Sequence, residues 1–336
     1  MSNALPDTAR IAADPRWLPH SIDLASERML FVHIDAGDLT APGFLADIDP
    51  GAAHNACWLP FDAVRSMQVE AGPLHFIFHT AFCRSTLLAR ALNIEGISVG
   101  MAEPGVIAHL ASAGERAHGL IGPVCNLLSR QWETAGGRSA AVFVKPTNHA
   151  NALIPALLSA RPDATAVLMT NPLPTFLRSV DSRALMGRRW GRQLYLETMG
   201  YIGMDLGLDG REQFLMTDLQ AAGIAWFLSQ RYFAGLLNGP DAARVRLLDG
   251  DRFDRDRTRA LEAVLSLAGV AFDKAGLQAV VEGPLFRRHA KLGGAFAGEA
   301  AVPAPSFAQE AEQVGQWIGM IAEQAGVAVP VPQTLF

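Results

Sequence analysis

The clearest pattern in this chain is an alternation of apolar and amphipathic segments that begins at Pro73. Apolar runs of strand length occur at residues 74–78, 97–100, 140–145, 164–170 and 245–250. Between them, apolar residues at helical spacing predict helices, the longest at 217–237 with Thr217 as its N-cap. Near-continuous apolar strands separated by helices are typical of a parallel sheet covered on both faces. The pattern therefore predicts an α/β fold, a three-layer doubly wound parallel sheet.

Residues 1–72 form a different kind of segment, in which prolines interrupt the pattern repeatedly. Within it, residues 29–35 predict a strand, and residues 44–48 and 58–67 predict short ordered pieces. The segment is rich in aromatic residues, whereas a disordered arm would be poorer in them. We therefore expect an N-terminal extension over 1–72 that packs on a main domain over 73–336.

The end of the chain contains a basic cluster, a flexible stretch and a helix. The cluster FRRHAK is followed by residues rich in Gly, Ala and Pro, and the final helix is predicted at 307–325.

Composition and charge exclude several classes of protein. Half of the 336 residues are hydrophobic and 18% are charged, so the chain has enough apolar residues for a sizeable core. A net charge of −5 argues against a general nucleic-acid binder. The cysteines Cys57, Cys83 and Cys125 are widely spaced and predict neither a zinc site nor a disulfide framework, so no metal is expected.

The sequence shows neither a signal-peptide pattern nor an apolar run of the roughly 20 residues needed to cross a bilayer. We therefore expect a soluble, cytoplasmic protein with no membrane span.

Residues 74–92, LHFIFHTAFCRSTLLARAL, are the most informative stretch for function. An apolar strand, a tight turn, a hydroxyl pair and a helix follow one another, which is the layout of a phosphate-binding loop. The expected anion ligands are the side chains of Arg84, Ser85 and Thr86 and the backbone N–H groups from Cys83 to Leu87. The loop lacks both the Walker lysine and glycine. The alternatives are that Ser85 only caps the helix and that Cys83 is a small packed residue.

Two further strand ends carry groups suited to catalysis. Lys145 ends one apolar strand and can neutralise a leaving phosphate, and His149 follows it as a candidate general base. Glu103 follows another strand and can deprotonate an acceptor hydroxyl. The alternatives are a solvated lysine and an ordinary glutamate at a helix start, before Pro104.

Basic residues later in the chain are candidates for binding a second phosphate. Arg178 with the adjacent Ser179 forms one group, and Arg287, Arg288 and Lys291 form another. The alternative for such charges is a solvated helix face.

Taken in order along the chain, these motifs resemble the sulfotransferase family. FCRSTLLARAL resembles the family loop that holds the 5′-phosphosulfate of 3′-phosphoadenosine 5′-phosphosulfate. Residues 142–180 resemble the second block of the family, in which Lys145 matches the family's lysine and Asn171-Pro172 matches its Asp-Pro. Thr170 occupies the place of the family's 3′-phosphate arginine, and Ser179 lies near the place of its serine. The resemblance covers roughly residues 74–291.

This resemblance implies an enzyme that transfers a sulfuryl group from that donor to a hydroxyl or amine, without a metal. Glu103 resembles the catalytic base of some members, and the FRRHAK cluster resembles the C-terminal phosphate clamp. The sequence carries no code for the acceptor or for the oligomeric state.

Two other functions remain open. A non-catalytic relative would bind a nucleotide, or nothing, and act as an assembly module. An ATP- or GTP-dependent kinase or hydrolase is disfavoured because the chain contains no GxxxxGK[ST] motif.

Overall fold

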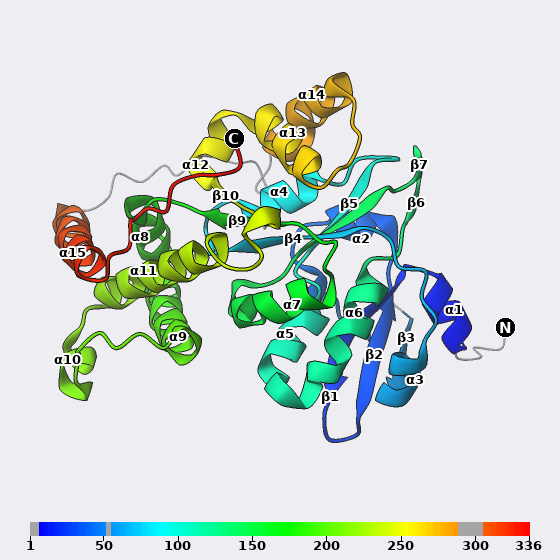
Figure 1. Cartoon of the computed structure of the whole chain (residues 1–336), viewed down its shortest axis with the longest axis horizontal. Coiled ribbons are helices and arrows are strands. Elements are labelled where there is room, and N and C mark those ends of the chain that lie inside the picture. The colour runs from blue at the N-terminus through cyan, green and yellow to red at the C-terminus, as the bar shows by residue number, and fades with distance from the viewer. Residues whose placement is uncertain (1–6, 52–54, 288–304) are drawn as a thin grey trace. The chain divides into compact units, whose positions relative to one another are not determined.

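Figure 1 shows the arrangement of helices and strands in the computed structural model, which describes residues 7–51, 55–287 and 305–336. Its main sheet has five strands: β4 (Leu74–His79), β5 (Ser98–Ala102), β8 (Ala141–Lys145), β9 (Ala166–Thr170) and β10 (Val245–Asp249). Strands β4 and β5 both pair with β8 in parallel. All residues of β4, β5, β8 and β9 are buried, as expected for strands with helices on both faces. The α/β fold with a parallel sheet is confirmed.

The strand order of this sheet, β10-β9-β4-β8-β5, reverses direction at β4. In the sheet, β8 and β5 lie on one side of β4, and β9 and β10 lie on the other. Ligands of open α/β sheets bind beyond the carboxyl ends of the strands at such a reversal. The strand order therefore favours a ligand site at the loop that follows β4.

The contacts divide the chain into two compact units. Unit 1 contains Met1–Phe78, Arg84–Val167 and Asp256–Phe296, and unit 2 contains His79–Cys83, Leu168–Arg255 and Ala297–Phe336.

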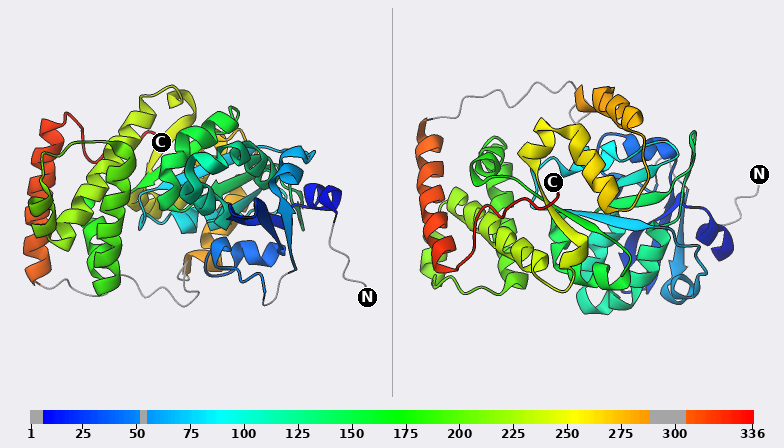
Figure 2. Two further views of the ribbon diagram at one scale, coloured as in Figure 1. Left: turned by 90° about the horizontal axis from the view of Figure 1, so that it is seen from below. Right: turned by 45° about the horizontal axis from the view of Figure 1, so that its top comes forward.

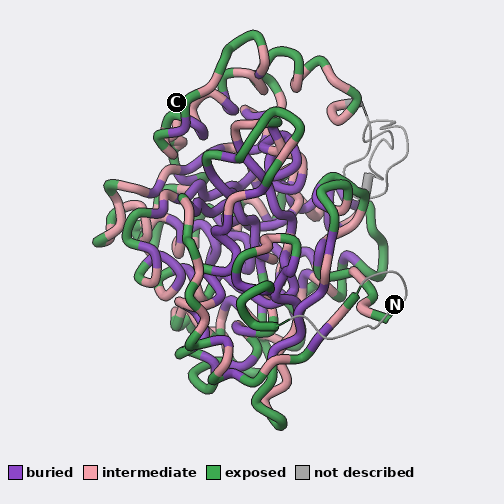
Figure 3. The backbone as a smooth tube through the Cα atoms, turned by 90° about the vertical axis from the view of Figure 1, so that its right-hand side faces the viewer, coloured by how far each residue is buried: buried purple, intermediate pink, exposed green. Residues whose placement is uncertain are grey.

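The helices of unit 1 that follow the N-terminal segment are short. They are α4 (Ser85–Ala91), α5 (Gly105–Ala113), α6 (Ile121–Leu128), α7 (Ile154–Ala160), α13 (Arg257–Leu267) and α14 (Lys274–Glu282), with 3-10 turns η2 (Gly114–Leu120), η3 (Asn148–Leu153) and η5 (Pro284–Arg287). A small hairpin also belongs to this unit, formed by β6 (Glu133–Thr134) and β7 (Gly137–Arg138). Figure 3 colours the backbone by burial, and buried and exposed stretches alternate along it.

The N-terminal segment of unit 1 is ordered around a three-stranded antiparallel sheet. It consists of α1 (Thr8–Ala13), β1 (Trp17–Asp23), β2 (Arg28–His33), α2 (Ala36–Thr40), η1 (Leu45–Asp47), β3 (Ala56–Pro60) and α3 (Phe61–Ser66). The strand predicted at 29–35 is confirmed as β2. Strand β1 was not predicted because it contains Pro19; it lies at the sheet edge, with an irregular register between Pro19 and Ser21.

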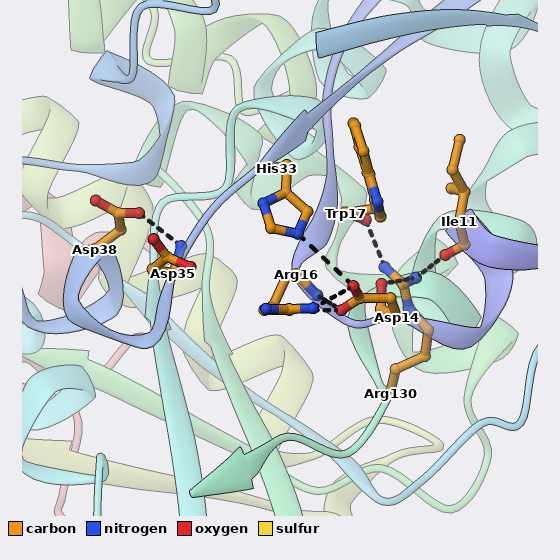
Figure 4. A network of polar contacts seen from close by, with 8 residues as sticks. All are labelled: Ile11, Asp14, Arg16, Trp17, His33, Asp35, Asp38 and Arg130. Atoms are coloured by element: carbon orange, nitrogen blue, oxygen red, sulfur yellow. Dashed lines mark hydrogen bonds and ion pairs between the residues drawn. The ribbon is translucent and has the colours of Figure 1, made fainter. Parts of the chain in front are cut away.

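A buried arginine attaches this segment to the remainder of unit 1 (Figure 4). Arg130 donates from Nη1 to the carbonyls of Ile11 and Asp14, the latter at 2.8 Å, and from Nη2 to Trp17 at 2.6 Å. Its Nε donates to Leu127 at 2.7 Å. Burial lowers the pKa of Arg130 to about 9. The carbonyl oxygens compensate the guanidinium for the water it has lost, so this side chain fixes the start of the chain in place.

Unit 2 contains the longest helices. They are α8 (Leu173–Asp181), α9 (Ala184–Ile202), α10 (Gly210–Leu215), α11 (Asp218–Leu237), α12 (Gly250–Arg255), α15 (Pro305–Gln324) and the turn η4 (Ala242–Arg244). Helix α9 packs against α8 and α11, and α11 also packs against α15 (Figures 1 and 2). The prediction for α11 is confirmed, including its N-cap, because Thr217 Oγ1 accepts from the N–H of Gln220 at 3.1 Å.

Helix α9 was not predicted, because glycines interrupt its sequence and the periodicity is weak. The structure gives two of these glycines a packing role. A Cβ on Gly187 would lie 2.0 Å from the carbonyl oxygen of Val180, and one on Gly191 would lie 2.9 Å from Cβ of Ala222. These positions let α9 approach its neighbours closely, which explains glycines inside a helix.

Candidate functional site

The loop between β4 and α4 has an unusual backbone. Ala81, Phe82 and Arg84 all have positive φ, at 68°, 55° and 65°. This left-handed region costs L-residues roughly 1–2 kcal/mol each and is normally left to glycine. The loop therefore has glycine-like turns although it contains no glycine. Strained backbone of this kind concentrates at functional sites.

Local contacts of the loop backbone oppose this strain. His79 Nδ1 accepts from the N–H of Ala81 at 3.0 Å, and the N–H of Thr80 donates to the carbonyl of Met169 at 3.0 Å. The amide of Asn171 donates to the carbonyl of Phe82 at 3.3 Å. Asn171 thus connects the end of β9 to the loop.

The Phe82 side chain provides a second hold on the loop. Its ring centroid lies 4.7 Å from that of Trp190 and 5.9 Å from that of Phe176. The guanidinium carbon of Arg183 lies 4.2 Å from the Phe82 centroid. Aromatic and cation–π contacts of this kind contribute about 0.5–1.5 kcal/mol each, comparable to the backbone strain at one residue.

The hydroxyl pair lies in the first turn of α4, directly after Arg84. Ser85 and Thr86 are buried, and Leu87 is half-buried. Arg84 is the N-cap residue, and the N–H of Leu88 donates to its carbonyl at 3.1 Å. The N–H groups of residues 85–87 precede that bond and have no carbonyl partner inside the helix.

Cys83 is fully buried. A Cβ on Gly250 would lie 2.5 Å from the carbonyl oxygen of Cys83, so the chain packs tightly against this residue. The burial agrees with a packed cysteine, whose contribution to a ligand would come from its backbone.

Lys145, which is buried, and Glu103, which is partly buried, form an ion pair at the ends of two neighbouring strands. Lys145 is the last residue of β8 and pairs with Ala102, so Glu103 follows directly at the end of β5. The Lys145 ammonium donates to Glu103 Oε1, and the N–H of Glu103 donates to the carbonyl of Lys145 at 2.7 Å. The side chains are 1% and 17% exposed. Glu103 also has a positive φ of 55°, which marks a constrained position.

Part of the N-terminal segment lies against this pair. The Lys145 ammonium nitrogen is 5.4 Å from the Phe44 ring centroid. The N–H of Ala46 donates to the carbonyl of Glu103 at 3.0 Å.

Arg90 of α4 holds the same part of the N-terminal segment. Its Nη2 donates to the carbonyls of Ala41 and Gly43 at 2.5 and 2.8 Å. Sequence reasoning missed both Phe44 and Arg90, because their contacts join positions 47 to 101 residues apart.

The other predicted residues have varied surroundings. His149 is exposed in η3. Arg178 is exposed and Ser179 is buried, so these neighbours on α8 have different surroundings. Arg287 ends η5, and Arg288 and Lys291 lie outside the described residues.

Thr170, which stands in the place of an arginine in the family pattern, has a buried hydroxyl. Its Oγ1 accepts from the Gln230 amide and from Thr80 Oγ1, the latter at 3.3 Å. The Thr170 hydroxyl is therefore already hydrogen-bonded to other side chains of the protein.

Over the described parts of the chain, no group of three or more His, Cys, Asp or Glu side chains is placed to hold a metal ion. Nor does any helix in residues 7–51, 55–287 or 305–336 have the length and apolar character needed to cross a membrane.

Neither a family model nor a curated protein matches the chain. Among solved structures, the sulfotransferase domain from the curacin biosynthetic pathway is similar over 77% of this chain and 99% of that chain, with 12% identity and a TM-score of 0.41.

Proposed function

We propose that this protein transfers a sulfuryl group from 3′-phosphoadenosine 5′-phosphosulfate to a hydroxyl or amine acceptor. The observation that carries the proposal is the Lys145–Glu103 ion pair at the carboxyl ends of β8 and β5. Burying the Lys145 ammonium beside a partly buried carboxylate does not favour stability, since an apolar pair would stabilise the fold as well or better. Charged groups that a fold withdraws from water are enriched at functional sites.

The residues of the β4–α4 loop fit the phosphosulfate end of the donor. The left-handed turns at Ala81, Phe82 and Arg84 shape the backbone as anion-binding loops require, and Ser85 and Thr86 add hydroxyl donors. We assign this end of the donor to the Arg84, Ser85 and Thr86 side chains and to the backbone from Cys83 to Leu87.

The bound donor would supply an activated sulfuryl group on a bridging oxygen. The S–O bond to that oxygen breaks while a new S–O or S–N bond forms to the acceptor. Lys145 stabilises the negative charge that the bridging oxygen acquires. Glu103 takes the acceptor proton on Oε2, because Oε1 accepts from Lys145. His149, four positions after Lys145 and exposed, is the alternative base.

The 3′-phosphate of the donor requires a separate cation. We assign it to Arg178 with Ser179 or to the basic group Arg287, Arg288 and Lys291. In the first assignment the exposed Arg178 would supply the charge, because Ser179 is buried.

A non-catalytic binding or assembly module is the second candidate. The absence of glycine from the loop and the buried Thr170 hydroxyl favour it. Such a protein would bind adenosine 3′,5′-bisphosphate without turnover, or would not bind it at all. An ATP- or GTP-dependent kinase or hydrolase is the third, and magnesium-dependent ATP turnover would establish it.

The direct test is release of adenosine 3′,5′-bisphosphate from the donor in the presence of a panel of alcohols, phenols and amines. We expect acceptor-dependent release that falls by about 10²–10³ in Lys145→Met, as for loss of one charge-stabilising donor. Lys274→Met is the matched control, because Lys274 is an exposed lysine on α14. Acceptor-dependent release that is equal in both variants would exclude the role given to Lys145.

A further inference from the structure

Residues 331–336 lie against the edge strand of the main sheet. Strand β10 is outermost in the order β10-β9-β4-β8-β5, so one of its edges pairs with β9 and the other faces away from the sheet. The segment, red in Figures 1 and 2, returns from α15 to β10. The N–H groups of Thr334 and Leu335 both donate to the carbonyl of Leu247 at 3.1 Å. The segment therefore pairs with backbone groups that an open sheet edge would leave exposed.

Two side chains of this segment replace the carbonyls that a neighbouring strand would offer. Thr334 Oγ1 accepts from the N–H of Leu247 at 2.8 Å, and Gln333 Oε1 accepts from the N–H of Asp249 at 3.2 Å. Leu247 and Asp249 are alternate residues of β10, whose outward backbone groups lie along the same edge. The segment is thus docked on β10 by specific hydrogen bonds.

Gln230 of α11 connects the docked segment to the interior of unit 2. Gln230 is fully buried; its Oε1 accepts from the N–H of Val331 at 3.0 Å, and its Nε2 donates to Thr170 Oγ1. Because a backbone N–H can only donate, the amide oxygen has to face Val331 and the amide nitrogen has to face Thr170. The orientation of this side chain is therefore fixed from both sides.

Thr170 continues the connection to the β4–α4 loop. Its Oγ1 also accepts from Thr80 Oγ1 at 3.3 Å, and both side chains are buried. Thr80 directly precedes Ala81 and Phe82, the first two left-handed residues of the loop. A continuous series of hydrogen bonds within unit 2 thus runs from the docked segment through Gln230 to the start of this turn.

Support of this kind matters because the loop backbone is strained. Ala81, Phe82 and Arg84 have positive φ without being glycine. Such residues persist only where the surrounding structure holds them in place. Gln230 exerts its hold at Thr80, one residue before the first of them, so loss of its amide would loosen the turn where it begins.

We infer that Gln230 is a positioning residue for the β4–α4 loop and that residues 331–336, docked on β10, stabilise the donor-binding shape of this loop through it. The inference rests on the proposed function and adds to it a conformational control of the donor site. Gln230 acts through Thr170 and Thr80, without contact to the donor.

The test measures amide hydrogen exchange of the ligand-free protein, so that it needs neither binding nor turnover. Gln230→Met has a side chain of similar length and removes both hydrogen bonds. We expect exchange of residues 79–83 to become roughly tenfold faster, as for the loss of about one net buried hydrogen bond, while exchange in β8 is unchanged. An equal acceleration in β8 would show a general loss of stability and overturn the positioning role.

Variants of neighbouring residues provide the matched comparisons. Thr170→Val removes the hydroxyl that joins Gln230 to Thr80 and should accelerate exchange of the loop as Gln230→Met does. Thr170→Ser keeps this hydroxyl and should exchange like the wild type. Ser229→Ala is the control for loss of a buried polar group on α11, because Ser229 Oγ donates to the carbonyl of Ala225 within the helix at 2.8 Å. Loop exchange that is as fast in Ser229→Ala as in Gln230→Met contradicts the inference.

The role of the docked segment is tested by the double variant Gln333→Leu, Thr334→Val, which removes both side-chain acceptors from β10. We expect about threefold faster exchange of residues 79–83, because Gln230 remains but the N–H of Val331 is held less firmly. Gln313→Leu, at an exposed position of α15, should have no effect. An unchanged loop in the double variant overturns the role given to residues 331–336.

Binding of adenosine 3′,5′-bisphosphate separates this inference from the proposed function. We expect Gln230→Met and Thr170→Val to weaken binding roughly tenfold, in proportion to the smaller population of the competent loop, and Thr170→Ser and Ser229→Ala to bind like the wild type. Faster loop exchange with unchanged affinity overturns the inference, because the positioning would then have no effect on the site. A wild-type protein that does not bind overturns the donor assignment, whereas hydrogen exchange still decides whether Gln230 holds the loop.

Discussion

At the scale of single residues, Lys145 and Glu103 dominate the energetics of the site. An ammonium that is 1% exposed depends on its carboxylate partner, because burial has removed the water that would otherwise solvate it. Lys145 and Glu103, to which we assign charge stabilisation and proton removal, are thus hydrogen-bonded to each other.

We predict that Glu103→Leu lowers the free energy of unfolding by about 3–5 kcal/mol, because it removes the carboxylate partner of the buried Lys145. Lys145→Met should lower it by less, because the Glu103 side chain is 17% exposed. The double variant should recover most of this loss, since no charge is then buried. Urea denaturation of the four proteins measures the effect. A double variant as unstable as the sum of the singles would show that the pair does not behave as one unit.

Ala81 is a second residue whose contribution is predictable from its backbone. With φ at 68°, it occupies a conformation that glycine adopts without penalty. We predict that Ala81→Gly changes the free energy of unfolding by less than about 1 kcal/mol in either direction, because relief of strain offsets the added freedom of the unfolded chain.

Ala91→Gly in α4 serves as the control for Ala81→Gly. Both alanines are buried, but Ala91 is helical, so its replacement should cost about 1 kcal/mol or more. Thermal unfolding of the two variants is the measurement, and an equal loss would argue against a strained loop.

At the scale of elements, strand β4 carries a titratable group in its buried face. Burial lowers the pKa of His75 to about 4, and its Nδ1 accepts from the N–H of Thr165 at 3.3 Å. The imidazole ring is also 5.2 Å from that of Phe143. The folded protein therefore holds His75 neutral, whereas the unfolded chain protonates it near pH 6.5.

Because the folded-state pKa is the lower one, the stabilisation from neutral His75 is complete above about pH 6.5 and is lost as the pH falls towards 4. We predict a decrease of at most about 3 kcal/mol over this range. His75→Leu should flatten this part of the profile, while His118→Asn, at an exposed position, should not. Denaturant midpoints measured from pH 7 to pH 4 provide the comparison, and an unchanged slope in His75→Leu would exclude this residue as the cause.

The elements also show what a single sequence can reveal. Strand β4, its loop and α4 were predictable because the signal is contiguous: an apolar run, a turn and a helix former follow one another. Lys145 and Glu103 were each identified at strand ends, but their pairing was not, because it depends on the register between β5 and β8.

Other features lie beyond local pattern for physical reasons. The left-handed residues of the loop were not predictable, since Ala81 and Phe82 seldom adopt that conformation. Phe44 and Arg90 act through long-range contacts with no periodic signal. Helix α9 was missed because its glycines weaken the helical pattern, and their role in close packing is visible only in the folded structure.

At the scale of the whole molecule, the chain places its candidate groups after strands of one parallel sheet. The strand order reverses at β4, and the loop with Arg84, Ser85 and Thr86 follows that strand. The Lys145–Glu103 pair follows β8 and β5. We propose that this arrangement binds the donor 3′-phosphoadenosine 5′-phosphosulfate and its product, adenosine 3′,5′-bisphosphate.

Calorimetric titration of the purified protein with adenosine 3′,5′-bisphosphate tests this claim most directly, with adenosine 5′-monophosphate as the matched ligand that lacks the 3′-phosphate. We predict saturable binding of the bisphosphate with a Kd below about 0.1 mM, weaker binding of the monophosphate, and roughly tenfold weaker bisphosphate binding in Arg84→Ala. Arg84→Gly should weaken binding as much as Arg84→Ala, because both variants remove the guanidinium charge and only the glycine variant also relieves the backbone strain. The absence of binding by the wild-type protein at millimolar bisphosphate would contradict the account.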